Sequence, residues 1–384
     1  MQGFKNVNVY VEGQGIVKTN IGFENGKIAT LEAGANVEAL ADFSNVNAVV
    51  VPGFIDEHIH GAAGCDAMDG SIEALKSIAV AVASEGTTTF LATTMTQSPE
   101  NITNALKAVG EYIKANAEEG AAVGGVHLEG PFISPKHVGA QPPEYVAKPD
   151  AKVFEKYYLD SDKSVKIVSL APEVEGAEEL VKYLTDNGIV ASIAHTGAKY
   201  NDCLNAIKFG MTNVTHTYNA QTGLHHRDAG VVGAALLNDE LNAEIICDLI
   251  HVSVPAIKLV IKNKPHDKVT LITDSMRAKH MPDGESELGG QVVIVKNGEA
   301  RLQDGTLAGS VLKMNVAVKN VVESVGVEFT DAIDFATINP AKNLGISDKK
   351  GSIALGKDAD VTVLNRDTFE VLMTVRNGKV IYKA

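Results

Sequence analysis

A chain of 384 residues is long enough to bury a large core, and its formal charge of −14 disfavours binding to nucleic acid or to an anionic membrane surface. Hydrophobic residues make up 45% and charged residues 21%, which is typical of folded chains and not of disordered ones. The N-terminus lacks the apolar core of a signal peptide, no stretch approaches the roughly 18 apolar residues of a membrane span, and three scattered cysteines do not form a disulfide framework. We therefore expect a cytoplasmic protein.

The two ends of the chain share a pattern of short alternating runs separated by glycine turns, as in small antiparallel sheets. Near the C-terminus, Asn377-Gly378 is typical of a tight hairpin turn. We predict that the ends pair with each other into one small β-sandwich domain, made of residues 1–53 and 346–384.

Between the ends, apolar strand-like runs alternate with segments of helical spacing. Eight such runs occur, over residues 48–59, 87–93, 121–128, 165–171, 189–194, 211–217, 243–249 and 268–273. Ser98 before Pro99, and Ser253 before Val254-Pro255, are typical helix starts. Strand and helix alternating eight times predict an α/β fold with a (β/α)8 TIM-like barrel over residues 54–345, and a doubly wound open sheet is the alternative.

Polar side chains follow the carboxyl ends of these runs, which is the face of such a barrel that carries functional residues. His58 and His60 stand two residues apart in "PGFIDEHIHG", so their side chains should point to the same side of one strand. The remaining residues at predicted strand ends are His127, Glu129, His195, His216, Asp248, His251 and Asp274. Each of them alone is more often a hydrogen-bonded structural residue than a ligand, but the whole set on one rim favours a metal site.

Imidazole and carboxylate groups suit zinc, iron and related divalent ions. The residues that could hold two such ions are His58, His60, Glu129, His195 and His216, with Glu129 as a bridge. Asp274 would then carry a proton from an attacking water to a leaving group, which is a hydrolytic mechanism for a carbon–nitrogen bond. His127 is as well explained by a hydrogen bond or packing as by ligation, and for Cys65 we favour no role at the metal.

These segments resemble the amidohydrolase superfamily, and within it the deacetylases of phosphorylated amino sugars. "PGFIDEHIHG" is similar to the superfamily's first-strand motif, and "GSIALGKDADVTVLN" is similar to its return into the small β-domain. The narrower resemblance rests on "GVHLEGPFISPKHVGAQPP", "AHTGA", "THTYNA", "ITDSM" and "TLAGS" in this order. Glu129 is discriminating, because other branches use a carboxylated lysine near the end of the fourth strand, where this chain has "SLAPE".

The resemblance implies hydrolysis of N-acetylglucosamine 6-phosphate to glucosamine 6-phosphate and acetate, a step of amino-sugar catabolism. It implies Glu129, His195 and His216 as the core metal ligands and Asp274 as the general base and acid. It also implies a homodimer in which a subunit contributes to its neighbour's phosphate site. Because His58 and His60 are intact, where one-metal relatives have amides, the chain resembles the branch with two divalent metals per subunit, zinc, iron or manganese.

Further residues match positions that contact the substrate in this family. They are Ala140, Asn219, Ala220, Arg227, His251, Leu307, Ala308 and Gly309. Gln141 replaces a histidine of some relatives and can hydrogen-bond a sugar hydroxyl or a developing oxyanion. His226 and Arg227 suit phosphate oxygens, although a solvated loop explains them as well, and "TLAGS" fits an acetyl pocket or an ordinary glycine turn.

Two other functions stay open at this point. The same barrel and metals would serve an enzyme acting on another N-acyl compound, such as an N-acyl-amino acid, or on a cyclic amide. A catalytically silent barrel that acts as an interaction protein is the third alternative, but every position that hydrolysis requires holds a chemically competent residue.

Overall fold

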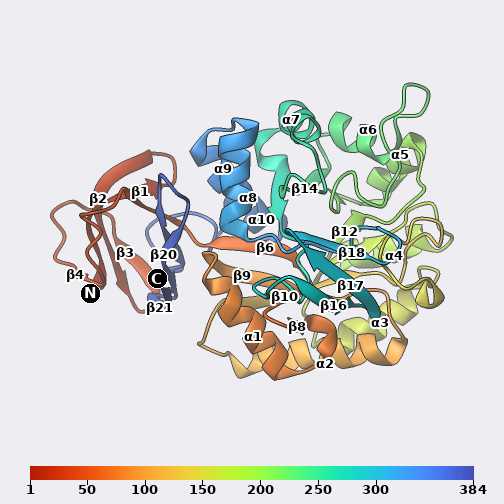
Figure 1. Cartoon of the computed structure of the whole chain (residues 1–384), viewed down its shortest axis with the longest axis horizontal. Helices are drawn as coiled ribbons and strands as arrows, with labels where there is room; N and C mark the ends of the chain where they lie inside the picture. Colours follow the sequence, from red (N-terminus) through yellow and green to blue (C-terminus); the bar gives the residue numbers. More distant parts are fainter.

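Eight parallel strands form the central sheet of the computed structural model, which describes residues 1–384 (Figure 1). In hydrogen-bonding order they are β6 (Phe54–Ile59), β9 (Thr87–Thr93), β10 (Ala122–Glu129), β11 (Val165–Leu170), β12 (Val190–Ile193), β13 (Asn213–Val214), β14 (Asn242–Ile246) and β15 (Val269–Ile272). The segments after β6 and β15 join the two edges, because the His60 amide donates to the Ser275 carbonyl and the Asp274 amide donates to the His58 carbonyl, at 2.9 and 2.8 Å. The predicted (β/α)8 barrel is confirmed.

Helices cover the outside of this barrel. They are α1 (Ile72–Ala83), α2 (Pro99–Ala115), α3 (Ala151–Asp160), α4 (Ala177–Asp186), α5 (Tyr200–Phe209), α6 (Gly230–Leu237), α7 (Val254–Asn263), α8 (Met314–Asn320), α9 (Phe329–Phe335) and α10 (Ile338–Asn343). The Ser98 hydroxyl caps α2 by accepting from the Asn101 amide at 3.2 Å, as predicted. Ser253 precedes α7 but makes no side-chain cap. None of the helices combines the length and the apolar composition that a membrane crossing requires.

The run at residues 48–59 is two strands instead of the single strand expected. Its first part, β5 (Ala48–Pro52), belongs to the sheet formed by the chain ends, and only β6 enters the barrel. The break falls at Gly53, where a Cβ atom would lie 2.3 Å from the Thr88 side chain, so only glycine fits this close passage. The valines before the histidine pair are therefore core residues of a different sheet.

The chain ends form a second sheet beside the barrel, which carries both termini (Figure 1). Its other strands are β1 (Gln2–Val11), β2 (Gly15–Glu24), β3 (Lys27–Thr30), β4 (Glu38–Ala39), β19 (Val361–Asn365), β20 (Val371–Arg376) and β21 (Lys379–Lys383). Antiparallel pairing of β5 with β19 joins the two ends, and Phe4 shares one apolar core with Met373. Asn377 and Gly378 turn β20 into β21 with φ of 49° and 74°, as a tight hairpin requires. The division at residues 53/54 and 345/346 stays a prediction.

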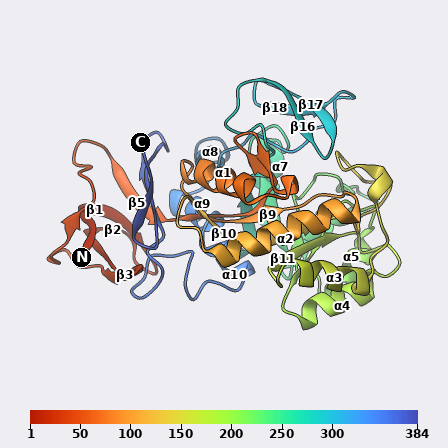
Figure 2. The same cartoon turned by 90° about the horizontal axis from the view of Figure 1, so that it is seen from below.

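A third sheet was not predicted. Its antiparallel strands are β16 (Gly284–Leu288), β17 (Gln291–Lys296) and β18 (Glu299–Leu302). Figure 2 shows it on one side of the barrel, away from α3 and α4. Its inner side chains, Leu288 and Val293 among them, share a small apolar cluster with Met95 and Ala308, and the Gln291 amide donates to the Ala140 carbonyl at 2.7 Å. This sheet therefore forms a wall beside the carboxyl ends of the barrel strands. A two-residue hairpin, β7 (Gly61–Ala62) with β8 (Cys65–Asp66), follows β6.

Candidate active site

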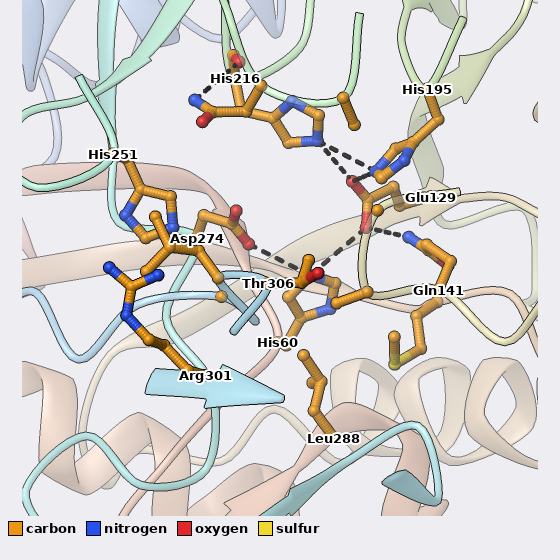
Figure 3. Close-up of a pocket in the computed structure, with 17 residues that line it drawn as sticks. His60, Glu129, Gln141, His195, His216, His251, Asp274, Leu288, Arg301 and Thr306 are labelled. Atoms are coloured by element: carbon orange, nitrogen blue, oxygen red, sulfur yellow. Dashed lines mark hydrogen bonds and ion pairs between the residues drawn. The ribbon is translucent and has the colours of Figure 1, made fainter. Parts of the chain in front are cut away.

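A pocket of about 340 Å³ opens at the carboxyl ends of the barrel strands (Figure 3). The predicted site residues that line it are His60, Glu129, Ala140, Gln141, His195, His216, Asn219, Ala220, His251, Asp274, Leu307 and Gly309. Residues from six different barrel strands or their following loops thus meet in one place, which is the arrangement expected for a barrel of this type.

Three side chains converge on one point at the floor of this pocket. Oε1 of Glu129 lies 3.2 Å from Nε2 of His195 and 2.9 Å from Nε2 of His216, and the two nitrogens are 3.2 Å apart. Ligands at 2.0–2.1 Å around a tetrahedral zinc ion are about 3.3–3.4 Å from one another. Three lone-pair-bearing atoms in a triangle of nearly this size fit a divalent ion.

A second group lies next to the first. Nε2 of His60 is 3.3 Å from Oδ1 of Asp274 and 3.3 Å from Oε2 of Glu129, so Glu129 directs one oxygen to each group. Nε2 of His58 is 3.5 Å from Oδ1 of Asp274, is fully buried and has no hydrogen-bond partner. A buried ring nitrogen without a partner is costly unless a ligand occupies its lone pair, so this group also fits a divalent ion.

Opposite charges control protonation in both groups. Burial raises the pKa of the Asp274 carboxyl, but the imidazoles of His58 and His60 outweigh it and bring that pKa to about 2. Burial also raises the pKa of the Glu129 carboxyl. His58, His195 and other imidazoles outweigh this effect and hold that pKa well below its usual range. Burial lowers the pKa of His60, whereas Asp274 and Glu129 raise it well above its usual value. Both carboxylates are thus kept ionised, in the form that a cation binds.

The backbone at three of these residues is left-handed. His195, His216 and Asp274 have φ of 44°, 31° and 48°, a conformation that side-chain-bearing residues rarely adopt. Backbone bonds hold the turns, for example from the Asp274 amide to the His58 carbonyl at 2.8 Å and from the Ser310 amide to the Asp274 carbonyl at 2.8 Å. Such strained residues concentrate at functional sites, where the surrounding fold maintains them.

Buried polar groups behind the pocket orient the candidate ligands. Oε2 of Glu244, on β14, is 3.4 Å from Nδ1 of His58, and the His137 carbonyl is 3.0 Å from Nδ1 of His195. An acceptor at Nδ1 favours the tautomer whose Nε2 lone pair faces the pocket. Burial raises the pKa of Glu244 to about 8.

His127 uses both ring nitrogens for hydrogen bonds. Its Nδ1 lies 2.9 Å from the Glu57 carbonyl, and its Nε2 lies 2.7 Å from the Ser169 hydroxyl. Burial lowers its pKa well below the usual value, which favours a neutral ring. These contacts support the structural role over ligation, although the sequence left both open.

Gln141 faces the candidate ligand Glu129. Its Nε2 donates to Oε2 of Glu129 at 2.7 Å, and its Oε1 accepts from the Thr96 amide at 2.6 Å. The side chain is buried and held at both ends. Gln141 therefore orients the Glu129 carboxylate in this structure while also lining the pocket.

His251 is anchored in a similar way. Oδ1 of Asp248 accepts from the amides of Ile250 and His251, both at 2.8 Å, and Oδ2 lies 2.6 Å from Nδ1 of His251. This leaves Nε2 as the free nitrogen of the ring.

The structure does not bring every predicted residue to the pocket. His226 and Arg227, in the loop after β13, are exposed and do not line the pocket, and Nη1 of Arg227 lies 2.6 Å from Nε2 of His226. Ala308 is fully buried beside Met95 and Met276 instead of lining the pocket, and His58 lies behind the lining residues.

Other lining residues were not predicted. They are Met95, Gly139, Leu288, Arg301 and Thr306. Leu288 and Arg301 belong to the third sheet, whose strands carry no motif. The one available signal for Arg301 was its position five residues before "TLAGS".

The class of the protein follows from comparison with known families. The model of the amidohydrolase family matches residues 49–381, and the chain belongs to this family. The narrower similarity is to deacetylases of 6-phosphorylated N-acetyl amino sugars. N-acetylglucosamine-6-phosphate deacetylase of Bacillus subtilis is 41% identical over 98% of this chain and 96% of that protein. N-acetylgalactosamine-6-phosphate deacetylase of Escherichia coli O157:H7 is 36% identical over 83% of this chain and 84% of that protein. The crystal structure of N-acetylglucosamine-6-phosphate deacetylase from Thermotoga maritima matches with a TM-score of 0.89 and 35% identity over 99% of both chains.

Proposed function

We propose that this protein hydrolyses the acetamide of N-acetylglucosamine 6-phosphate to glucosamine 6-phosphate and acetate, and that the reaction depends on divalent metal. The convergence of Glu129, His195 and His216 on one point, with Asp274 in the same pocket, carries the chemical part of this proposal. The choice of substrate is supported by the activity for which the 41% identical relative is named.

Two sets of residues would hold the metal. Glu129, His195 and His216 form one set, and His58 and His60 with the second oxygen of Glu129 form the other. A bound divalent ion lowers the pKa of water and polarises an amide carbonyl. The outer contacts from Glu244 and His137 keep the ring nitrogens of His58 and His195 facing the pocket.

Asp274 would act as the general base and then as the general acid. Its carboxylate lines the pocket and is almost fully buried, which places it next to a bound acetamide and away from bulk water. It accepts a proton from the attacking water and delivers it to the sugar nitrogen as the carbon–nitrogen bond breaks. Without that proton the amine is a poor leaving group.

The remaining lining residues would bind the sugar. Asn219, Ala220, Leu307 and Gly309 contribute backbone and side-chain groups to the pocket, and His251 offers a free Nε2. Small residues at Ala220 and Gly309 allow the close approach that an acetyl methyl requires.

The experiment that tests this function is acetate release from N-acetylglucosamine 6-phosphate by purified protein, with metal content determined on the same sample. We expect turnover that chelation abolishes and that strongly prefers the phosphorylated sugar over N-acetylglucosamine. Metal per subunit tests the two-ion arrangement. Metal-loaded protein that acts on neither sugar would contradict the proposed substrate, and a panel of other N-acyl compounds would then follow.

One relative supports a second candidate substrate. The Escherichia coli deacetylase that is 36% identical is named for N-acetylgalactosamine 6-phosphate, which differs only in configuration at one hydroxyl. The same assay with this sugar separates the two, because the preferred substrate has the higher kcat/KM.

We also propose a cytoplasmic homodimer in which Arg227 serves the neighbouring subunit. Arg227 is exposed and outside its own pocket, as this role requires. Sedimentation would give the assembly. Mixed dimers would test the role of Arg227: one subunit would carry Arg227→Gln and the other Asp274→Asn, and activity in these mixtures would show that the contact crosses the interface.

A further inference from the structure

The wall formed by the third sheet brings a fixed positive charge to the pocket. Arg301, on β18, is the only lysine or arginine among the residues that line it. Its side chain is 41% exposed, so the guanidinium remains open to a ligand. The other groups in the pocket that can carry a positive charge are imidazoles, and most of them belong to the metal cluster.

Two contacts fix the plane of this guanidinium. Nε donates to Oε2 of Glu299 at 2.7 Å, and Nη1 donates to the Gly305 carbonyl at 2.7 Å. Glu299 is two residues before Arg301 on the same strand, so both side chains leave β18 on one side. A guanidinium has five N–H groups, and these contacts use two of them. The other N–H groups are free to bind an anion such as phosphate. A phosphate dianion carries more charge than the Glu299 carboxylate that already contacts the guanidinium.

The backbone ties Arg301 to the predicted substrate loop. The Leu302 amide donates to the Thr306 carbonyl at 2.9 Å, and the Ala308 amide donates to the Ala300 carbonyl at 3.0 Å. Arg301 is therefore held in register with Leu307, which also lines the pocket. Because Glu299 and the Gly305 carbonyl also hold the guanidinium, the Arg301 side chain loses less conformational entropy when a ligand binds.

Arg301 lies at the end of the pocket that a 6-phosphate would reach. In Figure 3, Arg301 and His251 are on one side, and Glu129, Gln141 and His195 are on the other. In a 2-acetamido sugar 6-phosphate, the acetamide and the phosphate project from opposite sides of the ring. When the acetamide faces Glu129, the phosphate faces the side of Arg301 and His251.

We propose that Arg301 binds the 6-phosphate of the substrate in its own subunit and determines the preference for phosphorylated sugars. This rests on the proposed function, and it adds a contact within the same subunit to the one expected from Arg227 across a dimer. A planar guanidinium binds phosphate through two parallel hydrogen bonds, which a lysine does not reproduce.

The test is steady-state kinetics of Arg301→Gln with N-acetylglucosamine 6-phosphate and with N-acetylglucosamine. Loss of a charged hydrogen-bonding partner should raise KM for the phosphorylated sugar about 10- to 100-fold. kcat should change far less, and the loss for the unphosphorylated sugar should be much smaller, so the preference collapses. Arg301→Lys should fall between the wild type and Arg301→Gln. An equal loss on both sugars, or a preference within about twofold of the wild type, would overturn the proposal.

A matched control is Arg366→Gln, since Arg366 stacks on the Phe329 ring at 3.7 Å from its centroid and does not line the pocket. It should leave the preference unchanged. Calorimetry that compares the binding of glucosamine 6-phosphate with that of glucosamine separates the proposed phosphate site from the proposed reaction. If the wild type releases no acetate but binds the phosphorylated sugar through Arg301, the reaction is wrong and the phosphate site stands. If Arg301→Gln binds both sugars like the wild type, the phosphate site is wrong whatever the reaction.

Discussion

The two walls of the pocket are built in opposite ways. The barrel wall carries Glu129, His195 and Asp274 at the ends of parallel strands, buried and held by several hydrogen bonds each. The other wall is a three-stranded antiparallel sheet, residues 284–302, whose Arg301 is 41% exposed. Catalysis requires metal ligands and catalytic groups that are fixed to a few tenths of an ångström, and a closed barrel provides this rigidity. The sequence of an added sheet can vary between enzymes with different substrates while the barrel stays the same. Reaction and specificity are thus expected to respond to different substitutions.

Among substitutions in the barrel wall, we expect Asp274→Asn to lower activity most. An amide has the shape of the carboxylate but does not accept the proton from water, so kcat should fall about 10²- to 10⁴-fold. Metal at Glu129, His195 and His216 and the thermal midpoint should remain close to wild type. Acetate release, metal content and a melting curve on one preparation check this. Retained turnover would remove Asp274 from the mechanism.

The segment that leads from β15 to the third sheet is anchored to the barrel by a buried ion pair, and Lys279→Ala should break it. Nζ of Lys279 lies 3.1 Å from Glu85 and is fully buried, and leaving that carboxylate unpaired should cost about 3–5 kcal/mol of unfolding free energy. Denaturant titration measures this. The matched change Lys268→Ala, in a lysine that makes no ion pair, should cost far less.

Acidification should act on the same pair. Burial raises the pKa of Glu85, but Lys279 and His280 outweigh it and hold the pKa below its usual 4.5. The unfolded state therefore binds the proton first as pH falls. The stabilisation is full above pH 4.5 and is lost as pH drops through the folded pKa, so wild type and Lys279→Ala should converge at low pH.

A smaller effect on the barrel wall should follow from Glu244→Gln. Oε2 of Glu244 lies 3.4 Å from Nδ1 of His58, and exchanging this carboxyl for an amide should weaken the ion at His58 and His60 about 10- to 100-fold, because the ring is then oriented less well. Metal retained against a graded chelator series is the readout. Glu57→Gln is the control, because Glu57 is equally buried but its carboxylate contacts Asn343. Equal metal loss in both variants would point to general disturbance of the barrel interior.

The smallest effect belongs to the third sheet. Gln291→Ala removes the hydrogen bond to the Ala140 carbonyl that attaches this wall to the rim. One such bond is worth about 0.5–1.5 kcal/mol, so KM should rise only a few-fold while kcat holds. A drop in kcat without a change in KM would show that the third sheet also affects the reaction step, so that reaction and specificity do not depend on different walls.

Much of the barrel was predictable because its signals are local. Eight apolar runs alternating with helical segments predicted the strands, and Ser98 and Asn377-Gly378 predicted a helix start and a hairpin. The polar residues at strand ends could be grouped because parallel strands in a barrel end on one face. Arg301 escaped prediction, since nothing near it in sequence shows that β18 folds back over the rim.

The sequence by itself determined the fold class, the family and the residue types of the candidate metal site, because hydrophobic periodicity and motif order are properties of the chain. Only the tertiary structure decided that the run at residues 48–59 breaks into the two strands β5 and β6, that the rings of His195 and His216 meet one oxygen of Glu129, and that Arg227 stays outside the pocket while Arg301 enters it. The physical reason is that these facts depend on the direction of side chains from segments distant in sequence. Those directions are set by packing and by backbone hydrogen bonds between the segments, which leave no local trace.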